Sequence, residues 1–156
     1  FASYPRSNRF EIGRQYSTSA DDFAAVRTIG ETTSGDYVVL ANQSVSAAAI
    51  ATSGFKTYFT DPEGNAPVFY YPVPTSSPLY AMYLSMVYDE PSRKNAEQAH
   101  ALTGVRTVYF VLNDYWANAA VLKERAKMEA DEWSDVGDGH TTVFTYRFEP
   151  VGPKAP

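Results

Sequence analysis

The chain has 156 residues, of which 44% are hydrophobic and 20% charged, and its net charge is −5. This size and composition are typical of one folded globular domain, and the lack of any Lys/Arg-rich run argues against nucleic acid as a partner. The chain contains no cysteine, which excludes disulfides, thiolate nucleophiles and cysteine-ligated metals.

The first half of the chain predicts helices alternating with short strands. Residues 1–18 show no sustained period and predict an irregular arm. Ser19 is a typical helix N-cap, and apolar residues then recur at helical spacing. We expect a helix that starts at Ser19 and ends at Gly30 or Gly35, and a strand over Tyr37–Leu40. A helix over about Gln43–Ser53, a short edge strand over Phe55–Phe59 and a strand over Val68–Tyr71 should follow.

The second half contains the strongest strand signal. Val105–Leu112 is almost continuously apolar, which is typical of a central strand buried on both faces. Pro78 fits the first position of a helix, and Ser92 fits an N-cap. We expect a helix after Pro78, a helix from Ser92 to Gly104, the strand just named, a long helix over about Asn118–Ser134 and a strand over Thr142–Phe148.

This alternation of helices and strands predicts an α/β fold. We expect a three-layer sandwich with a mainly parallel sheet of about four strands and Rossmann-like topology. The clean alternation within Thr142–Phe148 indicates an antiparallel edge strand. Residues 19–149 would form a single domain, preceded by the arm over 1–18 and followed by a flexible tail over 150–156.

Polar and aromatic residues follow three of the predicted strands. Carboxyl ends of parallel strands meet at one edge of a sheet, where α/β folds bind ligands. Amides, hydroxyls, one carboxylate and aromatic rings together suit a neutral sugar or polyol. The alternative is that the polar groups only cap helices. The predicted ligand-binding residues are Asn42, Gln43, Ser44, Tyr71, Thr75, Ser76, Asn113, Asp114, Tyr115 and Trp116.

Motifs for catalysis, metals and phosphate are weak or missing. His100 shares a helix face with alanines and is expected to lie in the core or at its boundary, whereas His140 is expected in a solvated turn. No G-x-S-x-G or phosphate-binding glycine motif occurs. The acidic residues between 131 and 138 do not have EF-hand spacing. We therefore expect no catalytic residue to be identifiable, and no metal or cofactor.

Three segments carry a family resemblance. YVVLANQSVSAAAI (37–50), FYYPVPTSSPLYAMYL (69–84) and VYFVLNDYW (108–116) resemble the soluble tail domain of large multi-span bacterial membrane proteins, including glycosyltransferase-like ones. In such proteins the catalytic carboxylates and the lipid-carrier site belong to the membrane part. The resemblance therefore implies an extracytoplasmic accessory domain, and it assigns no catalytic residue to this chain.

We expect a non-catalytic accessory domain, tethered to the membrane through a missing parent segment, that binds or positions a glycan or a protein partner. Because the chain begins with Phe1 rather than Met, we expect a fragment of a longer protein. It contains no apolar run near the roughly 18 residues of a membrane span, and without a tether the alternative location is soluble and cytoplasmic. One alternative is a stand-alone enzyme acting on a sugar or nucleotide, with Asp114 as acid or base. Another is a structural domain whose arm docks on a neighbour.

Overall fold

The computed structural model describes residues 20–32, 37–53, 57–60, 67–72, 77–114, 116–137 and 139–149. The predicted arm (1–18) and tail (150–156) lie outside the described residues. The described elements are, in chain order, α2 (Ala20–Thr32), β1 (Tyr37–Leu40), α3 (Gln43–Ser53), β2 (Thr57–Thr60), β3 (Pro67–Phe69), α4 (Pro78–Tyr88), α5 (Arg93–Thr103), β4 (Thr107–Asn113), α6 (Ala119–Glu129), β5 (Glu132–Val136) and β6 (Thr141–Arg147).

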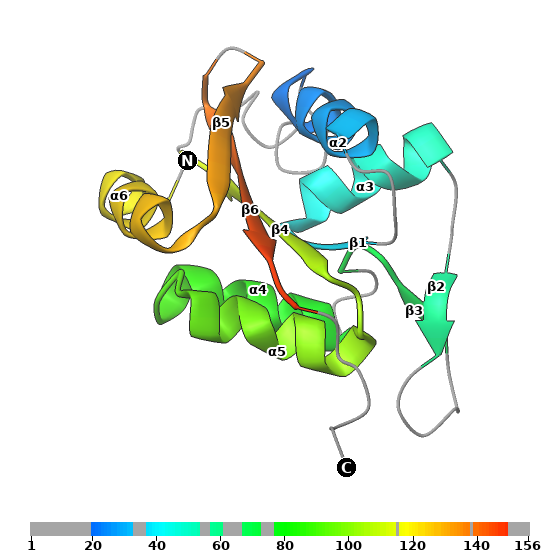
Figure 1. The fold of residues 1–156 in the computed structure, drawn as a ribbon. Helices are drawn as coiled ribbons and strands as arrows, with labels where there is room; N and C mark the ends of the chain where they lie inside the picture. Colours follow the sequence, from blue (N-terminus) through cyan, green and yellow to red (C-terminus); the bar gives the residue numbers. More distant parts are fainter. Residues whose placement is uncertain are drawn as a thin grey trace.

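The predicted three-layer α/β sandwich is confirmed. A four-stranded sheet has the strand order β1-β4-β6-β5, while β2 and β3 pair as a separate two-stranded sheet. Helices α2 and α3 cover one face of the larger sheet, and α4, α5 and α6 cover the other (Figure 1). None of the described helices, the longest of which has 13 residues, is long and apolar enough to cross a membrane.

Strand β4 is central, as its apolar sequence predicts. It pairs with β1 on one side and β6 on the other. Because side chains alternate along a strand, Phe110 faces the α4–α6 layer, while Tyr109 and Val111 face the α2–α3 layer. The two hydrophobic clusters thus lie on opposite faces of the same strand.

The strand pairing is more antiparallel than the sequence predicts. β1 and β4 are parallel, but β6 is antiparallel to both β4 and β5 and lies between them rather than at the edge. β3 pairs antiparallel with β2 and does not join the large sheet. The physical reason is connection length, because the short links between β2 and β3 and between β5 and β6 allow hairpins, whereas a parallel pair needs a crossover of about a dozen residues or more.

The prediction of a helix over Asn118–Ser134 is wrong at its carboxyl end. Helix α6 ends at Glu129, and the next residues form the edge strand β5. Ala130 already has an extended backbone (φ −79°, ψ 154°), and the Asp131 amide donates to the Thr145 carbonyl (2.8 Å). Pairing with β6 overrides the local helical spacing, which is a non-local effect that a single-sequence pattern does not contain.

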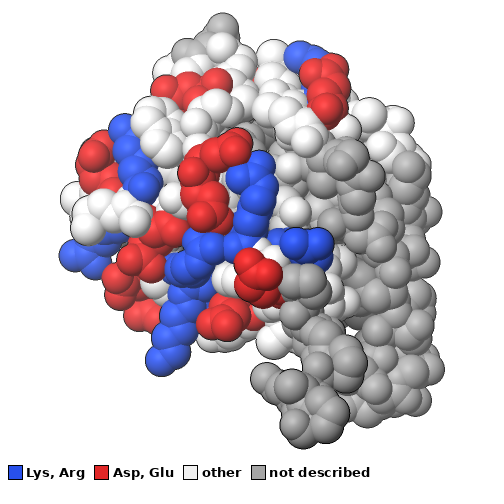
Figure 2. Space-filling model, viewed as in Figure 1, with Lys and Arg blue, Asp and Glu red and all other residues white. Residues whose placement is uncertain are grey.

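Charged side chains of both signs are interleaved along β5 and its neighbours (Figure 2). Ion pairs join Lys123 to Asp135 (2.8 Å) and Arg147 to Glu132 (2.8 Å). A hydrogen bond from Lys123 and a smaller contribution from a hydrogen bond of Thr142 hold the pKa of Asp135 below its usual range. Exposed pairs contribute little stability, but here they leave the charged side chains of this edge locally balanced.

The turn between β5 and β6 fixes the amino end of α2. Asp21, which is buried, accepts a hydrogen bond from the His140 backbone amide (3.2 Å). Gly137 has a positive φ of 58°, and a Cβ added there would lie 2.0 Å from the Asp21 Oδ1 atom. Glycine is therefore required both for the backbone conformation and for the close approach of Asp21.

Replacing Gly137 with alanine is expected to lower the free energy of unfolding by about 2–3 kcal/mol, because left-handed strain and the clash with Asp21 add. Gly139→Ala is the matched control, since Gly139 lies in the same turn at φ 90° with nothing within 4 Å of its added Cβ. That control should show the conformational cost alone. Urea unfolding measures both, and equal losses would refute the proposed contact.

Candidate functional site

The carboxyl ends of β1 and β4 lie together, because these two strands are parallel. The Asn42 Nδ2 group donates to the Asn113 Oδ1 atom (2.9 Å). Both side chains are buried, with exposed fractions of 7% and 6%. Two of the three strand ends named in the sequence analysis are thus brought into contact.

The amides at this edge form an internal hydrogen-bond network. Asn42 caps α3, since its Oδ1 atom accepts from the Val45 amide (2.9 Å). The Asn113 Nδ2 group donates to Thr141 Oγ1 (3.2 Å) on β6 and to Asp22 Oδ1 (3.4 Å) on α2. Asn42 therefore caps a helix, as the alternative interpretation expects. We call the buried amides of Asn42 and Asn113 the inner layer of this edge, and Asp22 of α2 closes it.

The other predicted site residues are spread over several environments. Tyr71 is buried in the cluster between the sheet and the α2–α3 layer, although the preceding Tyr70 carbonyl accepts from the Val39 amide of β1 (2.8 Å). On the first turn of α3, Gln43 is exposed and Ser44 is half-buried. Three predicted residues lie outside the described part of the chain: Thr75, Ser76 and Tyr115.

Outside the closed layer, Asp114 and His140 form a surface pair. The Asp114 carboxylate lies 2.7 Å from the His140 Nδ1 atom, and the two side chains are 59% and 69% exposed. The Asp114 amide also donates to the His140 carbonyl (2.9 Å). The pair exists because antiparallel β6 starts where β4 ends, with Asn113 opposite Thr141. The sequence places His140 in a solvated turn but does not reveal this partner.

Trp116 meets a residue that the sequence analysis did not single out. Its ring packs edge-on against Tyr88 at the end of α4, with 5.3 Å between ring centroids and an interplanar angle of 85°. The Trp116 Nε1 group donates to the hydroxyl of Tyr83 (3.2 Å), a side chain only 1% exposed. We call Tyr88 and Trp116 the aromatic platform. Tyr88 is 72% exposed. Sequence spacing alone does not distinguish it from the other tyrosines of α4.

Metal ligands are not grouped in the described ranges. No set of three or more His, Asp or Glu side chains in them could hold a metal ion. His100 is buried, with its Nδ1 atom 2.7 Å from the Val105 carbonyl oxygen and its ring stacked on Phe148 at 4.8 Å. This histidine therefore lies within the packed boundary of the fold, away from the Asp114–His140 pair.

The strand-end edge thus has a closed inner layer of amides, with the exposed Asp114–His140 pair and the partly exposed aromatic platform outside it. Such a surface can pack an apolar face of a ligand and accept hydrogen bonds from its hydroxyls. Comparisons of the chain with protein-family models, with curated proteins and with solved structures found no match in any of the three.

Proposed function

We propose that this chain is a non-catalytic accessory domain that binds a neutral glycan at the aromatic platform. In this proposal the domain is extracytoplasmic and belongs to a membrane protein. The observation that carries the proposal is the packing of Tyr88, 72% exposed, against the fixed ring of Trp116. The resemblance of segments 37–50, 69–84 and 108–116 to soluble tail domains of bacterial membrane proteins supports the accessory role and the location.

A glycan suits this surface for three reasons. An aromatic ring offers an apolar face to the C–H groups of a sugar, and the Asp114 carboxylate can accept hydrogen bonds from sugar hydroxyls. The hydrogen bond from Trp116 to Tyr83 orients the indole before binding, which reduces the entropy lost when a ligand is bound. A net charge of −5 disfavours strongly anionic ligands, so a neutral glycan is expected.

The environment of the polar groups supports a binding role over catalysis. Asn42 and Asn113 use their amides inside the protein. Asp114 and His140 are more than half exposed, so water screens their interaction, whereas catalytic groups gain strength from a site that excludes water.

A glycan array tests the proposal. The wild-type chain should bind a subset of neutral glycans, and Tyr88→Ala should weaken binding by about tenfold or more, which corresponds to about 1.4 kcal/mol. The melting temperature should hardly change, because Tyr88 is mostly exposed. Met128→Ala is the control, since Met128 is 81% exposed on α6 and should bind as the wild type does. Equal binding by Tyr88→Ala would refute the aromatic platform as the binding site, and no binding by any form would overturn the glycan assignment.

One observation favours a second function, a stand-alone enzyme acting on a sugar or nucleotide. The 2.7 Å contact between Asp114 and His140 is the kind of contact by which a carboxylate orients an imidazole for proton transfer. This reading predicts turnover by the wild-type chain that Asp114→Asn abolishes without a change in melting temperature. Asp89→Asn, at another exposed aspartate, should keep full activity. Absence of turnover on both substrate classes would eliminate the enzyme.

A further inference from the structure

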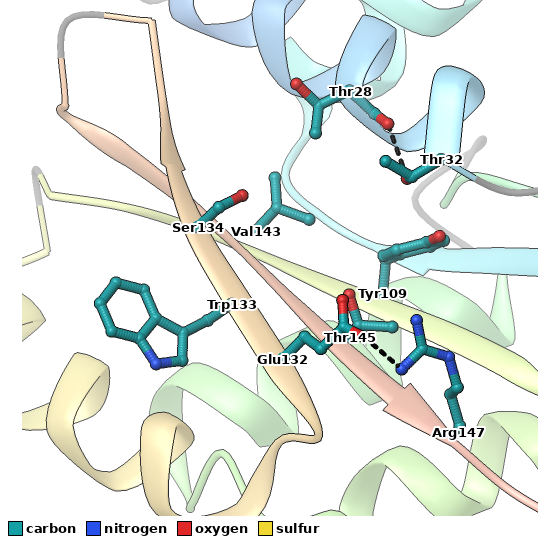
Figure 3. Close-up of a pocket in the computed structure, with 9 residues that line it drawn as sticks. All are labelled: Thr28, Thr32, Tyr109, Glu132, Trp133, Ser134, Val143, Thr145 and Arg147. Carbon is teal, nitrogen blue, oxygen red and sulfur yellow. Dashed lines mark hydrogen bonds and ion pairs between the residues drawn. The ribbon is translucent and has the colours of Figure 1, made fainter.

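A small cavity lies on the other face of the sheet from the aromatic platform. It has a volume of about 90 Å³ and lies between the sheet and the second half of α2, which contributes Thr28 and Thr32 (Figure 3). Its floor is formed by residues of β4 and β6, including Tyr109 and Thr145. Trp116 instead packs against the α4–α6 side, so the two surfaces are separate.

Thr145 contributes a hydroxyl to this cavity. Its side chain is 7% exposed and lines the cavity beside Tyr109. Within the described ranges the Thr145 hydroxyl makes no hydrogen bond to protein, although the Thr145 carbonyl accepts from the Asp131 amide. The hydroxyl is therefore available to bond water or a ligand that enters the cavity.

The rim of the cavity carries a balanced pair of charges. The Arg147 guanidinium donates to Glu132 Oε2 (2.8 Å), and the two side chains are 52% and 64% exposed. This hydrogen bond raises the pKa of Arg147, and the opposite charges of Arg147 and Glu132 face each other at the rim. A ligand with a full charge of either sign would meet attraction from one partner and repulsion from the other. A neutral ligand that both donates and accepts hydrogen bonds avoids this conflict.

We propose that the cavity binds the vicinal-diol end of a neutral polyol, with one hydroxyl bonded to Thr145 and the other placed between Arg147 and Glu132. The volume limits what can enter, because about 90 Å³ is the space of roughly three water molecules. A two- or three-carbon diol therefore fits, while the remainder of a larger polyol stays in solvent. This site does not depend on the aromatic platform, since it lies on the opposite face and uses different residues.

Two-dimensional NMR of the full chain, titrated with glycerol, tests the proposal. Glycerol should shift the amide signals of Thr145 and Arg147 in a saturable way. 1,3-Propanediol and acetate should bind at least about tenfold more weakly. 1,3-Propanediol lacks adjacent hydroxyls and so loses one of the paired hydrogen bonds, and acetate is repelled by the negative charge of Glu132. Equal affinity for glycerol and either of these probes would overturn the proposal.

Variants separate this site from general effects on the fold. Thr145→Val keeps the shape of the side chain and should reduce glycerol affinity about tenfold, and Arg147→Gln should reduce it similarly. Thr52→Val, on the far end of α3 with its hydroxyl bonded to the Ala48 carbonyl, should bind as the wild type does. Tyr88→Ala should also leave the glycerol titration unchanged, even where it abolishes glycan binding. Unchanged affinity in both Thr145→Val and Arg147→Gln would refute the site.

Discussion

Replacing Phe110 with alanine is expected to lower the free energy of unfolding by about 4 kcal/mol, the range found for large core aromatics. Phe110 is 0% exposed on the central strand β4. Its ring centroid lies 5.8 Å from that of Phe144 on β6 and 6.3 Å from that of Tyr83 on α4. The truncation therefore removes contacts between the sheet and the α4–α6 layer and leaves a cavity that neighbouring strands cannot easily fill.

Urea unfolding monitored by circular dichroism measures this loss. Phe110→Leu serves as the matched control, because it keeps most of the apolar volume and should cost about 1–1.5 kcal/mol. If Phe110→Ala cost no more than this control, Phe110 could not occupy the centre of the core, and the position of β4 between β1 and β6 would be wrong.

Replacing Asn113 with alanine is expected to lower the free energy of unfolding by about 3 kcal/mol. The change removes hydrogen bonds to Asn42, Thr141 and Asp22. It also deprives the buried Asn42 Nδ2 group of the acceptor it uses, and buried polar groups that lose a partner cost about 1–3 kcal/mol each. One side chain thus connects α2, the junction between β1 and α3, and β6.

Asn118→Ala provides the comparison for Asn113→Ala. Asn118 is exposed and makes no side-chain capping bond at the start of α6, so its loss should stay within about 0.5 kcal/mol. Thermal and urea unfolding of the two variants should therefore differ clearly. Similar small losses at both positions would mean that the Asn113 amide faces solvent, and the closed inner layer would not exist.

Much of the fold could be predicted from local sequence. The continuous apolar run of β4, Pro78 and Ser92 at helix starts, and Gly104 at a helix end predict elements that the structure contains. Gly104 indeed has a left-handed φ of 78° at the end of α5. Strand β5 could not be predicted, because its residues continue the helical spacing of α6 and become a strand only by pairing with β6.

The candidate site shows the same division between local and non-local information. The sequence predicts that the ends of these two parallel strands meet, and Asn42 and Asn113 do lie together there. It does not predict that the two amides bond to each other. The pairing of His140 with Asp114 requires the antiparallel register of β6. The packing of Tyr88 on Trp116 depends on where the carboxyl end of α4 lies against the sheet. Neither register nor helix position is encoded in local spacing.

Fluorescence of Trp116 offers the most direct test of the aromatic platform. The chain has two tryptophans, so Trp133→Phe leaves Trp116 as the only indole. Titration of this variant with soluble neutral oligosaccharides should produce a saturable change in emission for at least one of them, and the same titration should give no saturable change once Tyr88→Ala is added. An emission spectrum that no oligosaccharide alters, up to millimolar concentrations, would contradict glycan binding at Tyr88 and Trp116.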